Sequence, residues 1–283
     1  MQKIRLAGVP EHFNFPVHQG IESGVFKDNG FEVEWHEYPD GTGAMNKSLR
    51  AGDVDMAIIL LEGVVRDIAN GNPTQIVQNY VSSPLLWGIH VAADSKFKTQ
   101  EDLQSARIAI SRYGSGSHLM AYLHADAMGW DTSDLKFVEI GTLDGAIEAL
   151  SNDKADYFMW EHFTTKPVVD KGIFRWLGDF PTPWSSFVIV ATKSFLEENA
   201  ELGRQFLDQL NILTKDFKNS YSLSKTLSDR YLQKEEDVEK WLLKTQWSQK
   251  QVDNHEIKRV LDRLTQLQIL ENPIDSENFL RNI

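Results

Sequence analysis

A glycine- and serine-rich turn near the middle of the chain reads Ser111-Arg112-Tyr113-Gly114-Ser115-Gly116-Ser117-His118. It follows a short apolar run of strand type at 107–110 and leads into a helical pattern over 119–128. This order forms a cradle for an anion, because the first turn of a helix presents unpaired N–H groups and the positive end of its dipole. Ser115 and Ser117 add hydroxyls that either cap the helix or donate to a ligand. The turn is therefore a candidate ligand site, and a plain turn with a serine cap explains the same residues equally well at this point.

The turn does not carry a nucleotide-binding motif. No Gly-Lys-Ser/Thr follows it, and Leu119 stands where a dinucleotide-binding motif would have its third glycine. Nucleotide binding is therefore not expected.

The composition excludes several classes of function. The 283 residues, 41% of them hydrophobic, suit one or two globular domains. The net charge of −12, without a long run of Lys or Arg, disfavours nucleic acid and anionic membranes as partners. The absence of cysteine excludes disulfides, thiolate zinc sites, iron–sulfur clusters and cysteine nucleophiles. No run approaches the roughly 18 apolar residues that cross a bilayer, so we expect no membrane insertion.

The first residues bear on where the protein is located. Met1 leads directly into an alternating strand pattern, without the apolar segment and cleavage site of a secretory signal. We expect a cytoplasmic protein as the sequence stands. The alternative is a periplasmic or lipid-anchored protein whose signal has been removed.

The first sixty residues alternate between strand and helix patterns. The expected elements are a strand at 4–9, a helix at 17–27, a strand at 31–35, a helix at 44–51 and a strand at 54–59. This order is typical of a mainly parallel sheet covered by helices.

The same order returns about 100 residues later. Gly141-Thr142 echoes Gly41-Thr42, and Leu150 and Asp156 are spaced like Leu49 and Asp55. We therefore expect two similar α/β lobes.

Two long apolar strands, at 85–91 and 186–191, are candidates for the two crossings of a hinge. The chain beyond them changes to the helical period. We accordingly expect lobe 1 to comprise 1–91 and 187–283, with C-terminal helices at 197–283, and lobe 2 to comprise 92–186.

A series of residues along the chain resembles the type 2 periplasmic-binding-protein fold. These residues are Pro16, Gly20, Gly24-Val25-Phe26, Gly30-Phe31-Glu32-Val33-Glu34, Gly41-Thr42-Gly43, Leu49, Gly52, Val54-Asp55, Asp102-Leu103, Ile108-Ala109-Ile110 and Gly114-Ser115-Gly116-Ser117-His118. The most similar branch holds sulfonate, nitrate and thiamine-pyrimidine-precursor binders, and the chain resembles a subgroup of it that lacks an export signal.

The resemblance implies a two-lobed α/β clamp with a hinge and C-terminal helices, closing on a small molecule. The ligand is expected beyond the carboxyl ends of the strands, where the helices begin. The implied function is solute binding for uptake or sensing, with an ABC transporter permease as the implied protein partner.

The candidate ligand-binding residues follow the ends of the expected strands. They are Ser115, Gly116, Ser117 and His118 in the central turn; Gly41, Thr42 and Gly43 in the matching turn of lobe 1; Glu62 and Glu161 after two buried strands; Glu11, His12, Phe13 and Asn14 in the first loop; and Arg112, Trp160 and Trp184. Each has an ordinary structural alternative, namely a cap, a turn, a loop brace or core packing. Arg112 is expected to pair either with an anionic ligand or with Glu161.

The residue types in this set indicate the class of ligand. The two helix-terminus cradles favour an anion or a strong acceptor, whereas Glu11, Glu62 and Glu161 favour an N–H donor or a cation. A polar nitrogen-containing compound combines both characters, for example an aminopyrimidine, an amino acid derivative or an aminosulfonate. Bare nitrate or sulfate fits poorly, because nearby carboxylates repel it.

An enzyme on the same fold is the alternative function. The pyrimidine synthase of thiamine biosynthesis, which this branch resembles, carries a cysteine-rich iron motif, and this chain has no cysteine. Hydrolysis by His12 or His118 with Glu11 as base, or a metal held by Glu11, His12 and His118, fits the residue types alone. We expect a binding protein without catalytic residues, cofactor or metal.

Overall fold

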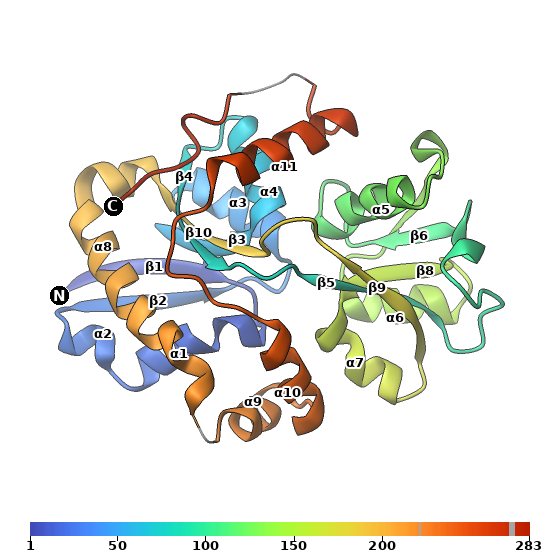
Figure 1. The fold of residues 1–283 in the computed structure, drawn as a ribbon, viewed down its shortest axis with the longest axis horizontal. Coiled ribbons are helices and arrows are strands. Elements are labelled where there is room, and N and C mark those ends of the chain that lie inside the picture. Colours follow the sequence, from blue (N-terminus) through green and yellow to red (C-terminus); the bar gives the residue numbers. More distant parts are fainter. Residues whose placement is uncertain (221, 272–274) are drawn as a thin grey trace. The chain divides into compact units, whose positions relative to one another are not determined.

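The computed structural model describes residues 1–220, 222–271 and 275–283, and the chain divides into two compact units. Unit 1 comprises Met1–Pro84 and Trp184–Ile283, and unit 2 comprises Leu85–Pro183. In Figure 1, unit 1 therefore holds both the blue N-terminal and the red C-terminal segments, whereas unit 2 runs from teal through green to yellow.

Unit 1 is built on a five-stranded sheet in the order β2-β1-β3-β10-β4. Its strands are β1 (Gln2–Gly8), β2 (Phe31–Glu37), β3 (Met56–Leu60), β4 (Thr74–Val81) and β10 (Phe187–Thr192). β1 pairs parallel with β2 and β3, whereas β10 runs antiparallel to β3 and β4. β3 and β10 are almost wholly buried, which explains their continuous apolar sequences. The predicted mainly parallel sheet is confirmed, with β10 as its one reversed strand.

The helices of unit 1 come from both ends of the chain. They are the short 3₁₀ helix η1 (His12–Asn14), α1 (Phe15–Glu22), α2 (Val25–Asp28), α3 (Thr42–Ala51), α4 (Leu61–Ala69), α8 (Lys193–Lys215), η4 (Phe217–Asn219), α9 (Leu223–Tyr231), α10 (Glu235–Lys244) and α11 (Asn254–Gln266). The helix expected at 17–27 is two helices, because Gly24 takes a left-handed conformation with φ 80°.

Unit 2 repeats this plan with a sheet in the order β7-β6-β8-β5-β9. Its strands are β5 (Leu86–Ala92), β6 (Arg107–Ile110), β7 (Lys136–Glu139), β8 (Tyr157–Glu161) and β9 (Phe174–Pro181). Its helices are η2 (Glu101–Leu103), α5 (Gly116–Ala127), η3 (Thr132–Asp134), α6 (Leu143–Ser151) and α7 (His162–Asp170). β6 is parallel to β7 and β8, and β5 is antiparallel to β8 and β9.

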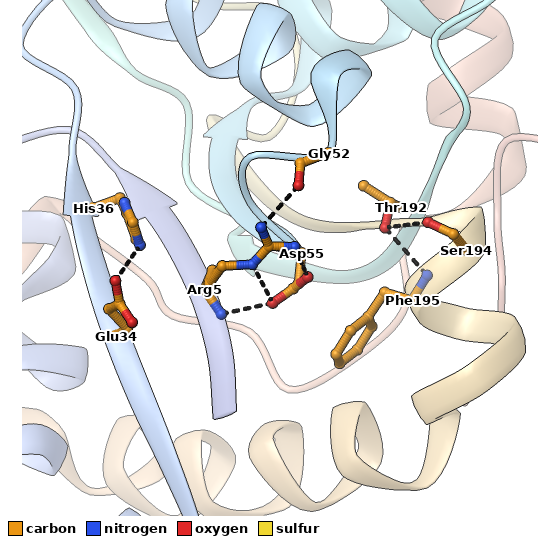
Figure 2. Close-up of polar contacts among 8 residues, drawn as sticks. All are labelled: Arg5, Glu34, His36, Gly52, Asp55, Thr192, Ser194 and Phe195. Atoms are coloured by element: carbon orange, nitrogen blue, oxygen red, sulfur yellow. Dashed lines mark hydrogen bonds and ion pairs between the residues drawn. The ribbon is translucent and has the colours of Figure 1, made fainter. Parts of the chain in front are cut away.

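An arginine–aspartate pair occurs at the same place in both units. In unit 1 the guanidinium of Arg5 on β1 forms two hydrogen bonds with Asp55 and a third with the carbonyl of Gly52 (Figure 2). In unit 2 Arg107 on β6 bonds Asp156 through Nε and Nη2 at 3.0 and 2.8 Å, and its Nη1 donates to the carbonyl of Asp153. Each pair ties the second strand of its sheet, β1 or β6, to the turn before the neighbouring central strand, β3 or β8. The internal repeat predicted from the sequence is therefore present in the structure.

The division between the units differs from the one expected. The sequence placed the boundaries after residues 91 and 186, whereas the structure divides after Pro84 and Pro183. The reason is that β5 pairs with β8 and β9 and so belongs to the sheet of unit 2. Within the described residues, no helix has both the length and the hydropathy of a membrane span.

Candidate functional site

Two helix N-termini lie against each other in unit 1, after β2 and β3. α3 begins at Thr42, two residues earlier than expected, and Gly41 precedes it with φ 72°. α4 begins directly after β3, with Glu62 in its first turn. A Cβ atom on Gly63 would lie 2.3 Å from Cγ2 of Thr42, so a larger residue at position 63 would require a shift at this contact. The first turns of both helices therefore come together.

Each of these two turns carries a buried oxygen without a partner. Oγ1 of Thr42 and Oε1 of Glu62 have no hydrogen-bond partner in the part of the chain that the structure describes. Leaving a buried polar group unpaired costs about 1–3 kcal/mol, so such groups are rare in folded proteins. A ligand that bonds to both atoms would remove this cost.

Glu62 is fully buried, and a hydrogen bond from Trp184 holds its carboxyl group. The indole Nε1–H of Trp184 donates to Oε2 of Glu62 at 2.9 Å. Burial raises the pKa of Glu62 to about 7, and the bonds from its own backbone N–H and from Trp184 act in the opposite direction. The carboxyl group therefore exchanges its proton near neutral pH.

The loop after β1 places His12 among aromatic rings. Its ring centroid lies 4.0 Å from that of Trp241, 5.1 Å from Phe13 and 5.8 Å from Tyr231. Burial lowers the pKa of His12 to about 3, so the ring stays neutral at ordinary pH. These contacts fit the core-packing alternative for His12.

The neighbours of His12 brace the same loop. Glu11 is the residue before η1, and Nδ2 of Asn14 donates to the carbonyl of Val9 at 2.8 Å. The carbonyl of Phe13 accepts from Oη of Tyr80 and Nε1 of Trp247. The ring of Phe13 is buried, and Oδ1 of Asn14 is buried without a partner among the described residues.

The central turn of unit 2 uses its serines internally. Ser115 is the N-cap of α5 and accepts from the N–H of His118 at 3.3 Å, while Gly116 begins the helix. Oγ of Ser117 accepts from the N–H of Ser111 and lies 3.0 Å from Oγ of Ser115. The helix-cap interpretation of Ser115 is thus confirmed, and ligand contacts from Ser115 and Ser117 stay a prediction.

His118 lies at the centre of an aromatic cluster that the sequence did not reveal. Its Nδ1 accepts from the N–H of Gly114 at 3.1 Å, so Nε2 carries the proton of the neutral ring. The rings of Tyr113, Tyr122 and Phe137 meet it edge to face at 4.7–5.2 Å. These residues are separated along the chain by up to 24 positions, which hides the cluster from local patterns.

Glu161 caps a helix rather than standing inside its first turn. It is the N-cap of α7, and its Oε2 accepts from the N–H and the hydroxyl of Thr164 at 2.7 and 2.8 Å. Burial raises its pKa. Arg112 forms no ion pair with Glu161 among the described residues. Trp160 stacks on Phe158 with ring centroids 5.3 Å apart, which fits its core-packing alternative.

The structure thus brings Gly41, Thr42, Gly43, Glu62 and Trp184 together in unit 1. It brings Arg112, Ser115, Gly116, Ser117 and His118 together in the α5 turn of unit 2. No cluster of three or more His, Asp or Glu residues suited to a metal ion occurs within residues 1–220, 222–271 and 275–283.

Comparison with solved structures defines the class of fold. The chain matches the Candida albicans CA3427 gene product, described as having the generic periplasmic binding protein fold, with TM-score 0.90, 24% identity, and coverage of 100% of this chain and 97% of that one. It matches the alkanesulfonate-binding protein SsuA from Xanthomonas axonopodis pv. citri with TM-score 0.85, 15% identity and coverage of 100% and 99%. The nitrate-binding protein NrtA from Synechocystis PCC 6803 matches with TM-score 0.74, 14% identity and coverage of 98% and 84%.

The chain has the type 2 periplasmic-binding-protein fold, which is the fold of solute-binding proteins, as the sequence predicted. The sequence model of a family described as Ca3427-like PBP matches residues 87–180, which lie within unit 2. No curated protein sequence matches the chain.

Proposed function

We propose that this protein binds a small solute without chemical conversion, and that the ligand contacts Thr42 and Glu62 of unit 1. The observation that carries the proposal is the buried carboxyl group of Glu62, which has one oxygen bonded to Trp184 and the other without a partner among the described residues. The solved structures of similar fold support it, since SsuA and NrtA are described as binding proteins.

The chemistry of the site favours a polar nitrogen-containing ligand. Oε1 of Glu62 accepts a hydrogen bond from an N–H group of the ligand when the carboxyl is ionised. The first turn of α3 and the hydroxyl of Thr42 offer donors to an acceptor or anionic group of the same ligand. An aminopyrimidine or an aminosulfonate has both groups. An inorganic anion meets the donors but is repelled by the carboxylate.

The biological role that we propose is delivery to an uptake system or sensing, with a transporter permease as the partner in the first case. Catalysis has less support from the site. His12, which directly follows Glu11 along the chain, is a weak base because burial lowers its pKa to about 3.

Native mass spectrometry of the freshly purified protein tests for a retained small molecule, and a thermal-shift panel then tests the class. The panel contains cytosine, taurine, sulfate and nitrate. We expect cytosine or taurine to raise the melting temperature. A ligand at 100 times its dissociation constant stabilises the folded protein by about 2.7 kcal/mol. Stabilisation by sulfate or nitrate alone would contradict the proposed class of ligand.

A further inference from the structure

Trp184 is the first residue of the second segment of unit 1, and it joins that segment to the first turn of α4. Its side chain is 4% exposed and Glu62 is 0% exposed. The bond from Nε1 of Trp184 to Oε2 of Glu62 spans 122 positions of the chain. An indole is a donor only, so Oε2 must act as the acceptor whatever the protonation state of the carboxyl group.

This one-sided bond distinguishes the two carboxyl oxygens. In a neutral carboxyl group the carbonyl oxygen is a stronger acceptor than the hydroxyl oxygen, so the bond from the indole favours the carbonyl at Oε2 and the proton on Oε1. Oε1 is also the buried oxygen without a partner among the described residues. We propose that Trp184 is a positioning residue, which holds Oε2 of Glu62 so that Oε1 is the atom that meets the ligand and exchanges the proton. The ligand part of this inference rests on the function proposed above.

The backbone around Trp184 is held firmly enough for this role. The next residue, Ser185, donates from its N–H and its hydroxyl to the carboxylate of Glu256 at 2.7 and 3.2 Å. The N–H of Leu61, beside Glu62, donates to the carbonyl of Ser186 at 3.0 Å. Both partners of the indole–carboxyl bond therefore lie on segments bonded to each other, which fixes the geometry before a ligand arrives.

The charge environment of Glu62 is simple. The pKa of its carboxyl group is raised by burial and lowered by its own backbone N–H and by Trp184, and no charged side chain of the described residues is among the causes. Removal of the indole donor should therefore move the titration of Glu62 in one direction, toward higher pH, because the ionised form loses its bond.

The test follows the Glu62 carboxyl group by carbon NMR in the ligand-free protein, with the resonance assigned by its loss in Glu62→Gln. We expect Trp184→Phe to raise the titration midpoint by about one pH unit. The matched control is Trp176→Phe, because Nε1 of Trp176 also donates to a carboxylate, that of Asp179, at 2.9 Å. Trp176→Phe should leave the Glu62 midpoint unchanged. An unchanged midpoint in Trp184→Phe would overturn the inference.

A second measurement needs no variant at this position and stays informative if Trp184→Phe does not fold. In the wild-type protein, the indole N–H resonance of Trp184 should shift with pH at the same midpoint as the Glu62 carboxyl group. An indole resonance that stays constant through that midpoint would overturn the inference. If both signals behave as expected but neither cytosine nor taurine binds, the proposed ligand class fails and the role of Trp184 in holding the carboxyl group is supported.

Discussion

The two units place the same residue types where a helix follows a strand, but they use the oxygens differently. In unit 2, Thr142 caps α6 by accepting from the N–H of Gly145, and Glu161 caps α7. In unit 1, Thr42 and Glu62 are the first and second residues of α3 and α4, and each has an oxygen that is buried without a partner among the described residues. One copy of the plan uses these side chains as helix caps, and the other leaves one oxygen of each side chain unpaired among the described residues.

A small shift along the chain produces this difference. Glu62 stands seven residues after Asp55, whereas Glu161 stands five residues after Asp156, although both aspartates pair with an arginine in the same way. The cap positions of unit 1 belong to Gly41 and Leu60, which have no side-chain oxygen. A duplicated scaffold can therefore keep its arginine–aspartate pair in both copies, while the side-chain oxygens at these two strand–helix junctions are bonded in one copy and in part unpaired in the other.

The largest expected effect is the pH dependence that Glu62 gives to unit 1. Its folded pKa of about 7 lies above the ordinary 4.5, so the folded state holds a proton that the unfolded chain has lost. This stability is full below about pH 4.5 and is lost as the pH rises through 7, a total of about 3 kcal/mol. Denaturant unfolding of wild type and Glu62→Gln should show this difference. A constant difference from pH 4 to 8 would contradict the buried, unpaired state of Glu62.

The arginine–aspartate pairs test where the units are alike. Asp55→Ala and Asp156→Ala should each lower the free energy of unfolding by about 2 kcal/mol. This loss is smaller than for a fully buried ion pair, because both arginine side chains are more than a third exposed to solvent. Chemical denaturation of the two variants measures both losses. A large loss in one unit and none in the other would show that the repeat is only a likeness of topology.

The contact between Gly63 and Thr42 tests the approach of α3 to α4. Gly63→Ala should cost about 1–2 kcal/mol, because the new methyl group meets Cγ2 of Thr42, whereas in an open helix the change would stabilise. Thr42→Ser removes that Cγ2 group, so the double variant should recover most of the loss. Independent, additive effects in the double-mutant cycle would refute the contact.

The smallest effect comes from the two threonines. Thr142→Val should cost up to about 1 kcal/mol through loss of the cap, whereas Thr42→Val should be neutral or slightly stabilising because its hydroxyl has no partner among the described residues. Thermal unfolding of this matched pair measures the difference. Equal losses would mean that Thr42 also supports its helix.

Sequence patterns predicted the fold because they are local and repeated. The strands at 85–91 and 186–191 and the spacing of Leu49 to Asp55 and of Leu150 to Asp156 follow from periodicity and turn residues. The patterns also named Thr42, Glu62 and Trp184 as candidates for the site, because all three follow or flank strand ends.

The relations between those residues were beyond local patterns. The bond from Trp184 to Glu62 joins positions 122 apart, and the break at Gly24 depends on a backbone angle that glycine permits but does not require. The different positions of Glu62 and Glu161 relative to the starts of their helices were also missed. The sequence at the end of a strand does not fix the first residue of the following helix to within two residues.

The most direct measurement of the central claim is a calorimetric titration of wild type, Glu62→Gln and Glu161→Gln with cytosine or taurine, whichever stabilises the protein more. We expect Glu62→Gln to lower the affinity at least tenfold, about 1.4 kcal/mol, because Oε1 is the proposed acceptor for the ligand. Glu161→Gln should change the affinity by less than about twofold, because a glutamine oxygen still accepts from Thr164. Equal losses of affinity in the two variants, or an unchanged affinity in Glu62→Gln, would contradict the claim that Glu62 of unit 1, and not Glu161 of unit 2, binds the ligand.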